Sequence, residues 1–461
     1  MKITILAGSP KGETSVTMQY VNYIIKKFPG HEYATFHVAQ RIKTIEKDEK
    51  AFSEIIDSVR TSDAVLWAFP LYYLVVHSGL KRFIELIGER GAEDAFAGKY
   101  AASLSTSIHF YDQTAHAYVR GISEDLGMRY AGYHSPEMHD LILEKERKRL
   151  LGFAGDFLAT VEKKLPVSRF FSPLSAVPTK YVPARPTAGV DPGDKKIVVL
   201  TDATDGQTNL LGMVERFCGS FTTKPVVVNL NDIDIAGGCL GCIRCGWDNT
   251  CAYTGKDGFV DFYRETIIPA DILVIAGAIK DRYLSSRFKL FFDRSFFMTH
   301  IPVMEGKQVA FLVSGPLSQA TPLSEALRGY FETQGASIVD FVSDETAGSA
   351  QLDGLITGLA GRLVWAADAQ YIRSMTFLGF AGRKIFRDDV WGRLRFPFVS
   401  DYRYYKKHGL LAFPQKTDKK FRMVNIFLTL LAHIRPIREK IYGQMIKHEM
   451  VKPIIRAVEK Y

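Results

Sequence analysis

Short apolar runs rich in β-branched residues alternate with segments of helical periodicity along the first part of the chain. Such runs predict buried strands, and apolar residues that recur every three to four positions predict amphipathic helices between them. The predicted strands are Lys2–Ala7, Tyr33–Val38, Ala64–Phe69, Tyr100–Thr106 and Met128–Tyr133, and the predicted helices are Val16–Lys27, Lys50–Arg60, Gln113–Leu126 and Glu137–Lys164. This alternation predicts a doubly wound parallel sheet of the α/β class.

The same pattern restarts after a proline-rich stretch. Residues 165–194 contain six prolines with Ser, Thr and Ala between them, which predicts a semi-extended linker. The second series has strands at Lys196–Thr201, Pro225–Leu230, Ile272–Ala276, Gln308–Val313 and Ser337–Phe341, with helices at Val260–Ile268, Leu284–Phe297 and Gln351–Ala367. We therefore expect a tandem duplication with domains at 1–165 and 195–370, a linker at 166–194, and a C-terminal extension at 371–461.

Three loops of the first copy are predicted to meet at one edge of its sheet. Ligands bind such sheets at the carboxyl ends of the strands, where loops 8–15, 70–77 and 105–113 lie. The first loop joins a strand to a helix and carries three hydroxyls and one charge, at Ser9, Thr14, Ser15 and Lys11. A helix N-terminus preceded by such a loop is suited to a phosphate. An ordinary turn with a helix cap is the alternative interpretation.

Four of the five cysteines fall within thirteen residues of the second copy. Their spacing is C-x2-C-x2-C-x5-C, at Cys239, Cys242, Cys245 and Cys251. Thiolates this close usually share a metal, and zinc sites more often use two separated pairs. A run of this kind is typical of a [4Fe–4S] cluster, with structural zinc or unligated or disulfide-forming thiols as alternatives. The start of the chain is interpreted as a strand rather than an export signal, and a reducing compartment favours metal ligation over disulfides.

These motifs together resemble a known family. Gly8-Ser9-Pro10-Lys11 followed by Thr14-Ser15, then Pro70-x-Tyr72 and Leu80-Lys81-x-Phe83, resemble the NADPH-dependent FMN reductase branch of the flavodoxin-like fold. With the cysteine run added, residues 1 to about 365 resemble the iron–sulfur flavoproteins of anaerobes, which carry FMN and a [4Fe–4S] cluster. The resemblance implies two tandem flavodoxin-like sheets, each of strand order 2-1-3-4-5.

The resemblance also implies the residues that hold the cofactors, although it names no catalytic residue. Lys11 stands where the family usually has Arg, and Lys keeps the charge but loses the bidentate fork. The implied FMN contacts are Ser9, Lys11, Thr14 and Ser15 for the phosphate, and Pro70, Leu71, Tyr72, Tyr73, Ser105, Thr106, Ser107 and His109 for the ring. The implied cluster ligands are Cys239, Cys242, Cys245 and Cys251.

The two copies are not equivalent. The second has Asp202 and Asp205 in place of the phosphate loop, and their charges would repel a phosphate. We expect a division of labour, with FMN in the first domain and the cluster in the second. A second flavin or a nucleotide in the second domain, with Lys280 or Arg282 supplying the charge, is the alternative.

The positive charge is concentrated at the C-terminal end. Residues 366–461 contain 20 Lys and Arg against 8 Asp and Glu, whereas the rest of the chain has 39 against 42. This basic, aromatic and mainly helical extension favours a structural wrap or oligomer contact, an anionic membrane surface, or an acidic partner. No nucleic-acid motif accompanies the charge, and no apolar run is long enough to span a bilayer.

The sequence thus predicts a cytoplasmic iron–sulfur flavoprotein oxidoreductase, with a peripheral membrane location left open. Electrons would pass between a [4Fe–4S] cluster and FMN, with a ferredoxin-like redox partner or NAD(P)H as donor. The alternatives are an NAD(P)H-dependent FMN or quinone reductase with structural cysteines, and an electron-transfer subunit of a larger complex. A homo-oligomer is a further possibility that the sequence leaves open.

Overall fold

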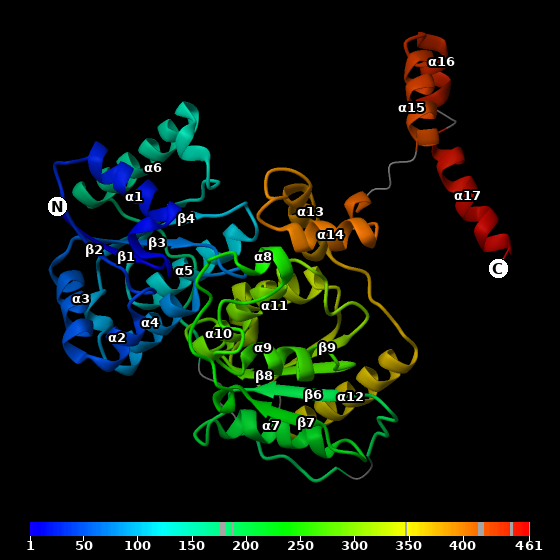
Figure 1. The fold of residues 1–461 in the computed structure, drawn as a ribbon, viewed down its shortest axis with the longest axis horizontal. Coiled ribbons are helices and arrows are strands. Elements are labelled where there is room, and N and C mark those ends of the chain that lie inside the picture. Colours follow the sequence, from blue (N-terminus) through cyan, green and yellow to red (C-terminus); the bar gives the residue numbers. More distant parts are fainter. Residues whose placement is uncertain (176–179, 187–188, 346–347, 414–418, 443–445, 461) are drawn as a thin grey trace. The chain divides into compact units, whose positions relative to one another are not determined.

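Two five-stranded parallel sheets form the body of the protein (Figure 1). The computed structural model describes residues 1–175, 180–186, 189–345, 348–413, 419–442 and 446–460. The first sheet has the order β2-β1-β3-β4-β5, and the second has the equivalent order β7-β6-β8-β9-β10. Both the α/β class and the predicted strand order are therefore confirmed. The strands are β1 (Lys2–Ala7), β2 (Glu32–Phe36), β3 (Ala64–Pro70), β4 (Tyr100–Thr106), β5 (Arg129–His134), β6 (Ile197–Thr201), β7 (Val226–Asn229), β8 (Ile272–Ala278), β9 (Gln308–Ser314) and β10 (Ser337–Ser343).

Helices cover both faces of each sheet. The outer face of the first sheet packs on α1 (Val16–Lys27) and α6 (Glu144–Glu162), and that of the second packs on α7 (Thr208–Gly219) and α12 (Ser349–Asp368). The inner faces of both sheets contribute to one continuous hydrophobic core, so the two copies pack as one body. The inner helices are α2 (Ile42–Lys47), α3 (Glu49–Thr61), α4 (Ser78–Glu89) and α5 (Asp112–Asp125) in the first copy, and α9 (Phe259–Phe262), α10 (Ser286–Arg294) and α11 (Thr321–Thr333) in the second.

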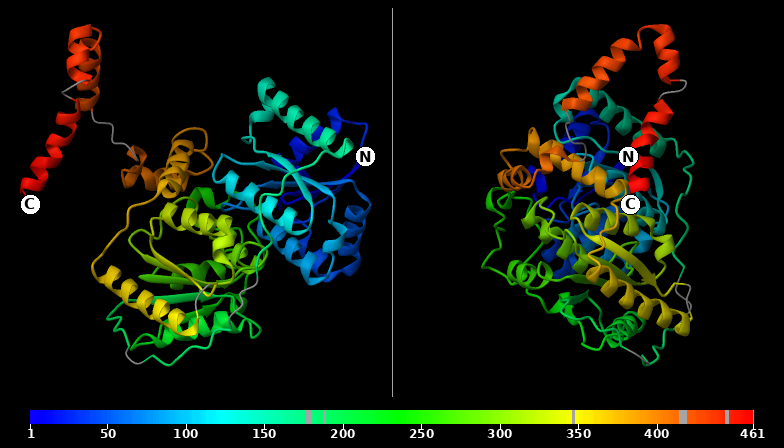
Figure 2. Two further views of the ribbon diagram at one scale, coloured as in Figure 1. Left: turned by 180° about the vertical axis from the view of Figure 1, so that it is seen from behind. Right: turned by 90° about the vertical axis from the view of Figure 1, so that its right-hand side faces the viewer.

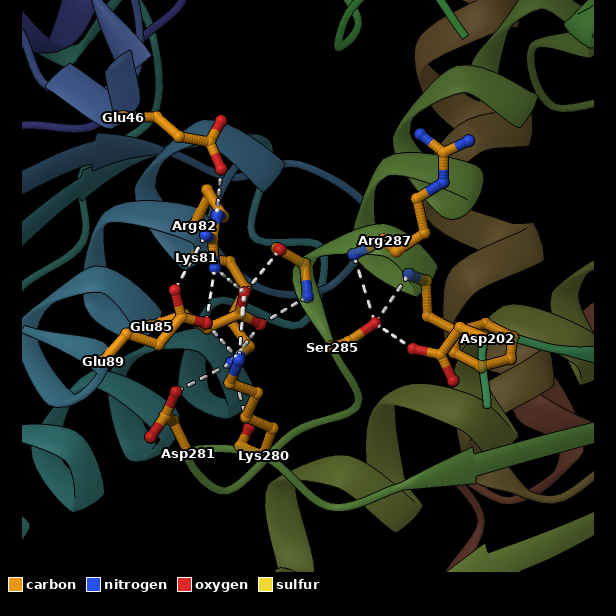
Figure 3. A network of polar contacts seen from close by, with 12 residues as sticks. Glu46, Lys81, Arg82, Glu85, Glu89, Asp202, Lys280, Asp281, Ser285 and Arg287 are labelled. Carbon is orange, nitrogen blue, oxygen red and sulfur yellow. Dashed lines mark hydrogen bonds and ion pairs between the residues drawn. The ribbon is translucent and has the colours of Figure 1, made fainter. Parts of the chain in front are cut away.

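The contact between α4 and α10 has a local twofold character. Lys81 of α4 donates to the Lys280 carbonyl at 2.9 Å, and Lys289 of α10 donates to the Tyr72 carbonyl at 3.0 Å. Glu85 forms an ion pair with Lys81 at 3.1 Å, and Asp293 forms one with Lys289. Figure 3 shows the first half of this arrangement, where Lys280 and Asp281 reach toward Glu85, Glu89 and Lys81. The duplication thus reproduces within one chain the symmetry of a dimer.

Several helix boundaries differ from the sequence prediction. The helix expected at 137–164 begins only at Glu144, because Asp140 accepts a hydrogen bond from the Glu137 N–H and starts a 3-10 turn over Asp140–Ile142. The helix expected at 260–268 is a short α-helical turn, α9, followed by a π-helical turn over Tyr263–Ile267. The predicted linker lies partly outside the described residues, at 176–179 and 187–188.

The C-terminal part is helical, as expected. Helices α13 (Phe377–Trp391) and α14 (Val399–Lys407) pack with the two sheets in one compact unit, Met1–His408 (Figure 2). Residues Gly409–Tyr461 form a second unit, with α15 (Lys419–Leu431), α16 (Arg435–Lys440) and α17 (Ile446–Lys460). None of the helices among the described residues is long and apolar enough to cross a membrane. The predicted four-part division of the chain remains a prediction.

Candidate functional site

A cavity of about 280 Å³ opens at the carboxyl ends of the first sheet's strands. Parallel sheets place their binding crevices at this edge. All three predicted loops reach it. The residues of the first domain that line it and were expected to contact FMN are Ser9, Lys11, Ser15, Pro70, Leu71, Tyr72, Tyr73, Thr106 and Ser107.

One end of the cavity is formed by the loop before α1. Ser15 caps the helix, since its hydroxyl accepts a hydrogen bond from the Met18 N–H at 3.2 Å. The Ser9 hydroxyl accepts from the Lys11 N–H at 3.2 Å, which folds the loop back on itself. Thr14 is exposed, is absent from the lining, and donates its hydroxyl proton to the Lys11 carbonyl at 2.9 Å. A helix N-terminus, two hydroxyls and one ammonium group therefore face this end.

The middle of the cavity is walled by the tight turn after β3. Tyr72 and Val75 exchange backbone hydrogen bonds, and Tyr73 and Leu74 between them adopt positive φ angles of 33° and 74°. Burial raises the pKa of both Tyr72 and Tyr73 well above the ordinary value, so both phenols stay protonated. The turn offers backbone and neutral aromatic surface to a ligand, which suits a flat ring.

The residues of the third loop that were predicted to contact FMN lie in different surroundings. Successive strand residues point to opposite faces, so Ser105 and Thr106 cannot both face the cavity. The Ser105 hydroxyl pairs with His116 Nε2 at 2.9 Å in a buried network, whereas Thr106 lines the cavity. His109 is absent from the lining, and its Nδ1 pairs with Asp112 at 2.9 Å, which raises its pKa. Contacts of Ser105 and His109 with FMN remain a prediction.

All four clustered cysteines line a second, smaller cavity. Burial raises the pKa of Cys239 to about 12 and raises that of Cys245 further. Such thiols stay protonated until a metal ion replaces the proton. Within the described ranges, no three His, Cys, Asp or Glu side chains are gathered closely enough to hold a single metal ion.

Two buried contacts anchor the cysteine loop. Arg294 pairs with Asp257 at 2.6 Å and donates to the Gly237 carbonyl at 2.9 Å. His77 of the first domain pairs through Nε2 with the Cys239 carbonyl at 3.0 Å, while its Nδ1 accepts from the Gly79 N–H. Burial lowers the pKa of His77, so the ring is neutral and Nε2 is the donor. The first domain thus holds the first cysteine of the second domain in place.

The two cavities share a wall. Cys239, Ile243 and Phe296 line both of them. Gly241, with φ of +61°, lies so close to the first domain that an added Cβ would come within 2.2 Å of the Tyr72 hydroxyl and 3.0 Å of Lys11. The cysteine loop therefore packs directly on the two loops that would hold the flavin.

The segment after the second domain closes the cavity, which the sequence did not reveal. Phe386, Leu394, Pro397 and Phe398 line the cavity together with His300. The Ser400 hydroxyl donates to the Gly246 carbonyl at 3.1 Å, which fastens α14 to the short helix α8 (Cys245–Asp248). These residues come from a stretch with no clear helical period, so only the tertiary structure identifies them.

In the second domain, the region that corresponds to the cavity of the first is filled by side chains of the surrounding loops. Asp202 accepts a hydrogen bond from the Ser285 hydroxyl, drawn in Figure 3, and burial raises its pKa. Asp344 accepts from Asn209 and Ser314 at 2.8 Å each. Carboxylates therefore lie where the first domain presents hydroxyls and Lys11.

Comparisons with known proteins agree with the first-domain assignment. Residues 1–133 match the family model described as NADPH-dependent FMN reductase. The resemblance is thereby confirmed for this part of the chain, and with it the expectation of a flavin-dependent oxidoreductase. No curated protein matches the chain.

Solved structures show likenesses of limited extent. FerB of Paracoccus denitrificans, a flavoenzyme NAD(P)H:(acceptor) oxidoreductase, is 21% identical over 35% of this chain and 97% of its own, with a TM-score of 0.30. An NADPH-quinone reductase of P. pentosaceus is 15% identical over 34% and 97%, with a TM-score of 0.28. General stress protein 14 of Treponema denticola, in complex with FMN, is 13% identical over 35% and 98%, with a TM-score of 0.26. At these scores the likenesses say nothing about the function of this chain.

Proposed function

We propose that the protein binds FMN in the cavity of the first domain and a [4Fe–4S] cluster on the four clustered cysteines, and that electrons pass between them. A flavin exchanges one or two electrons and a cluster exchanges one, so the pair connects single-electron donors with two-electron chemistry. The shared wall of the two cavities is the observation that carries this proposal.

The flavin cavity has the parts that FMN needs. Ser9, Lys11 and Ser15 form its polar end and are suited to the phosphate, because a helix N-terminus and one ammonium group face the same point. Pro70 to Tyr73 and the aromatic side chains of the closing segment form an apolar wall for the ring. Residues 1–133, which match the FMN reductase family, include this polar end and the turn after β3.

The donor set around the second cavity is chemically suited to a cluster. Four thiols from one short loop face one space, and thiolates are the usual ligands of [4Fe–4S] clusters. Phe296, Phe297 and Tyr253 surround them, and an apolar surrounding limits the access of water to a cluster. The second domain is proposed to hold only the cluster, since Asp202 and Asp344 occupy its own loop region.

Residues of this chain would fix the positions of the cluster and the flavin relative to each other. His77 fixes the Cys239 carbonyl, and Gly241 allows the cysteine loop to lie directly on Tyr72. The closing segment lines the cavity with Phe386 and Phe398, and these apolar side chains would reduce the access of water to the flavin. NAD(P)H as donor is consistent with the matched family, and a ferredoxin-like donor is the proposed alternative for the cluster.

A simpler function is favoured by the family match alone. The chain would then be an NAD(P)H-dependent FMN or quinone reductase in which the cysteines are structural. That account predicts a yellow protein without iron. It leaves unexplained why the cysteine loop lies against the flavin cavity rather than elsewhere on the second domain.

The last unit of the chain is proposed to dock on an anionic membrane surface. Met423, Phe427, Leu430 and Ile434 are exposed at helical spacing on and after α15, and Ile454, Ile455 and Val458 are exposed on α17. Arg435, Arg438 and Lys440 lie between these two apolar groups in the sequence, on α16, and all three are exposed. Basic helices with an exposed apolar face bind at lipid interfaces through burial and charge together.

Single cysteine substitutions test the cluster and the flavin separately. Cys242→Ser is expected to remove iron and leave FMN bound, because this cysteine lines only the second cavity. Cys218→Ser is the matched control, since Cys218 lies on α7 outside both cavities and should keep both groups. Loss of FMN together with iron in a folded Cys242→Ser protein would contradict two separate sites. An unchanged metal content would contradict the cluster.

A further inference from the structure

The flavin cavity contains a second feature that the cofactor contacts do not use. His300 lines it and pairs through Nδ1 with the carboxylate of Asp401 at 2.8 Å. His300 follows a short 3-10 turn of the second domain, and Asp401 lies on α14 of the closing segment. The two residues are distant in sequence and come together only because α14 folds over the cavity.

The carboxylate of Asp401 is fully buried, and each of its two oxygens has a hydrogen-bond partner. It accepts a hydrogen bond from the Thr299 hydroxyl on one oxygen and pairs with His300 on the other. A buried carboxylate is costly unless it is paired and hydrogen-bonded. The pairing therefore fixes the ring, with Nδ1–H toward Asp401.

The backbone before His300 is strained. Thr299 has φ of +55° and ψ of −121°, which is rare for a β-branched residue. The Tyr73 hydroxyl donates to the Thr299 carbonyl at 3.3 Å, and the Tyr405 hydroxyl donates to the His300 carbonyl at 2.8 Å. Strain that the surroundings hold in place is concentrated at functional sites. Here it sets the direction of one imidazole.

The other ring nitrogen is available to a ligand. Nε2 forms no hydrogen bond within the described part of the chain, and His300 lines the cavity away from its polar end at Ser9, Lys11 and Ser15. Phe386 lies against the ring with centroids 3.6 Å apart, and Phe296 and Phe398 lie edge-on to it. The wall around His300 is therefore aromatic, which suits a flat apolar ligand, and Nε2 is the polar atom of the ring that is left for it to contact.

We propose that His300 and Asp401 form a proton-donating pair, in which His300 Nε2 donates a proton to the oxygen of a flat carbonyl compound bound in the cavity. His300 is the catalytic residue, and Asp401 is a positioning residue that acts through it. This inference rests on the proposed function, because the reduced flavin is the reductant. A quinone takes up two electrons and two protons to become a hydroquinone. Reduced FMN, when bound, would supply the two electrons and one proton as a hydride, and His300 would supply the second proton.

In that step the Nε2–H bond breaks and the new O–H bond forms at the acceptor. His300 would enter this step as the imidazolium and leave it as the neutral imidazole, which regains its Nε2 proton from water, while Nδ1 keeps its proton, hydrogen-bonded to Asp401. An acceptor that takes electrons without protons does not need His300. A comparison of the two kinds of acceptor therefore distinguishes the loss of proton donation from the other effects of replacing His300.

The experiment compares two acceptors on the full-length holoprotein, reduced with dithionite and mixed with oxidant. His300→Asn keeps an N–H toward Asp401 and removes Nε2, and His300→Gln places an amide N–H near the Nε2 position. Both variants are expected to slow oxidation by 1,4-naphthoquinone by about 100-fold or more, the usual size of acid–base catalysis. Oxidation by ferricyanide, which takes no proton, should change little. His408→Gln, an exposed histidine at the end of α14, is the control.

Binding gives a second measurement that does not depend on turnover. The dissociation constant of 1,4-naphthoquinone for the oxidised protein should rise in His300→Asn and recover in part in His300→Gln, because only Gln restores a donor. An unchanged naphthoquinone rate, an equal loss with both acceptors, or loss of FMN from either variant would overturn the proposal. A wild-type protein with FMN but no iron would overturn the cluster alone, and the same comparison of acceptors would still decide about His300.

Discussion

The backbone N–H of Ser78 in the first domain donates a hydrogen bond of 2.7 Å to the carboxylate of Asp293 in the second. The reverse contact is also present, since the Ser286 N–H donates to Glu85 at 2.5 Å. Each carboxylate therefore caps the partner domain's helix and neutralises a buried lysine of its own helix. These reciprocal caps hold the two copies in the arrangement that brings the cysteine loop to the cavity of the first domain.

Glu85→Gln is expected to destabilise the protein. The substitution leaves the buried Lys81 with the partly exposed Asp281, at 3.3 Å, as its remaining carboxylate partner, and loss of the buried pair costs about 3 kcal/mol of unfolding free energy. Urea unfolding followed by circular dichroism measures the effect. Asp94→Asn, in the exposed pair with Arg60, is the control and should change stability little. Equal stability of the Glu85→Gln and wild-type proteins would show that the interface does not depend on this pair.

The same interface predicts a dependence of stability on pH. Hydrogen bonds from Arg82 and Lys280 lower the pKa of Glu89 from 4.5 to about 2. Because the folded pKa is depressed, the ionised carboxylate stabilises the fold above about pH 4.5, and this contribution is lost as the pH falls toward 2. Urea midpoints measured between pH 6 and pH 3 should fall less steeply in Glu89→Gln than in the wild type. Parallel curves would contradict the assignment.

The strands were predictable because buried parallel strands appear in the sequence as uninterrupted apolar runs. The loops that follow these strands were predictable for the same reason, and three of them, at 8–15, 70–77 and 105–113, line the cavity. Ser105 pairs with His116 while Thr106 lines the cavity, because successive strand residues point to opposite faces, and the contact of Ser105 with FMN remains a prediction. The start of α6 at Glu144 depends on an Asp140 turn that the apolar pattern does not reveal.

His300 and Asp401 could not have been found from the sequence alone. They lie about a hundred positions apart, and neither belongs to a motif. Their pairing depends on α14 packing over the cavity, and this depends on close contacts such as that between Gly246 and the Pro397 carbonyl. The segment that closes the cavity has no regular period of apolar residues. Its side chains reach the cavity through tertiary packing, which the periodicity of a sequence does not predict.

Lys11→Ala is expected to weaken FMN binding about tenfold or more, because a charge-assisted hydrogen bond to the phosphate contributes roughly 1.5–3 kcal/mol. Lys11→Arg should bind at least as well as the wild type, since Arg adds a second donor. Quenching of FMN fluorescence on titration of the apoprotein gives the dissociation constants. Lys26→Ala, at the far end of α1, is the matched control. An unchanged affinity in Lys11→Ala would place the phosphate elsewhere.

Gly241→Ala tests the contact between the cysteine loop and the flavin loops. A Cβ at this position would meet the Tyr72 hydroxyl at 2.2 Å, and φ of +61° disfavours alanine as well. Both cofactors should remain bound, while the electron transfer between them slows. Rapid-mixing spectroscopy of the two chromophores measures that rate. Gly255→Ala, also at positive φ but with open space around it, controls for backbone strain. Equal rates in Gly241→Ala and the wild type would show that this contact does not set the approach.

Reversal of charge in the last unit tests membrane docking. The double variant Arg435→Glu and Arg438→Glu should bind vesicles containing phosphatidylserine about tenfold or more weakly, since each basic residue near such a surface contributes about 1 kcal/mol. Co-sedimentation with the full-length protein measures binding, and vesicles of phosphatidylcholine alone provide the uncharged comparison. Equal binding of the double variant and the wild type would contradict docking through these arginines.

The count of iron, acid-labile sulfide and flavin in anaerobically purified protein tests the central claim most directly. The account predicts about four iron, four sulfide and one FMN per chain, with an electron paramagnetic resonance signal of a reduced cluster after dithionite. Flavin without iron would contradict the cluster and leave the simple reductase as the better description. Iron without flavin would contradict the assignment of the first-domain cavity.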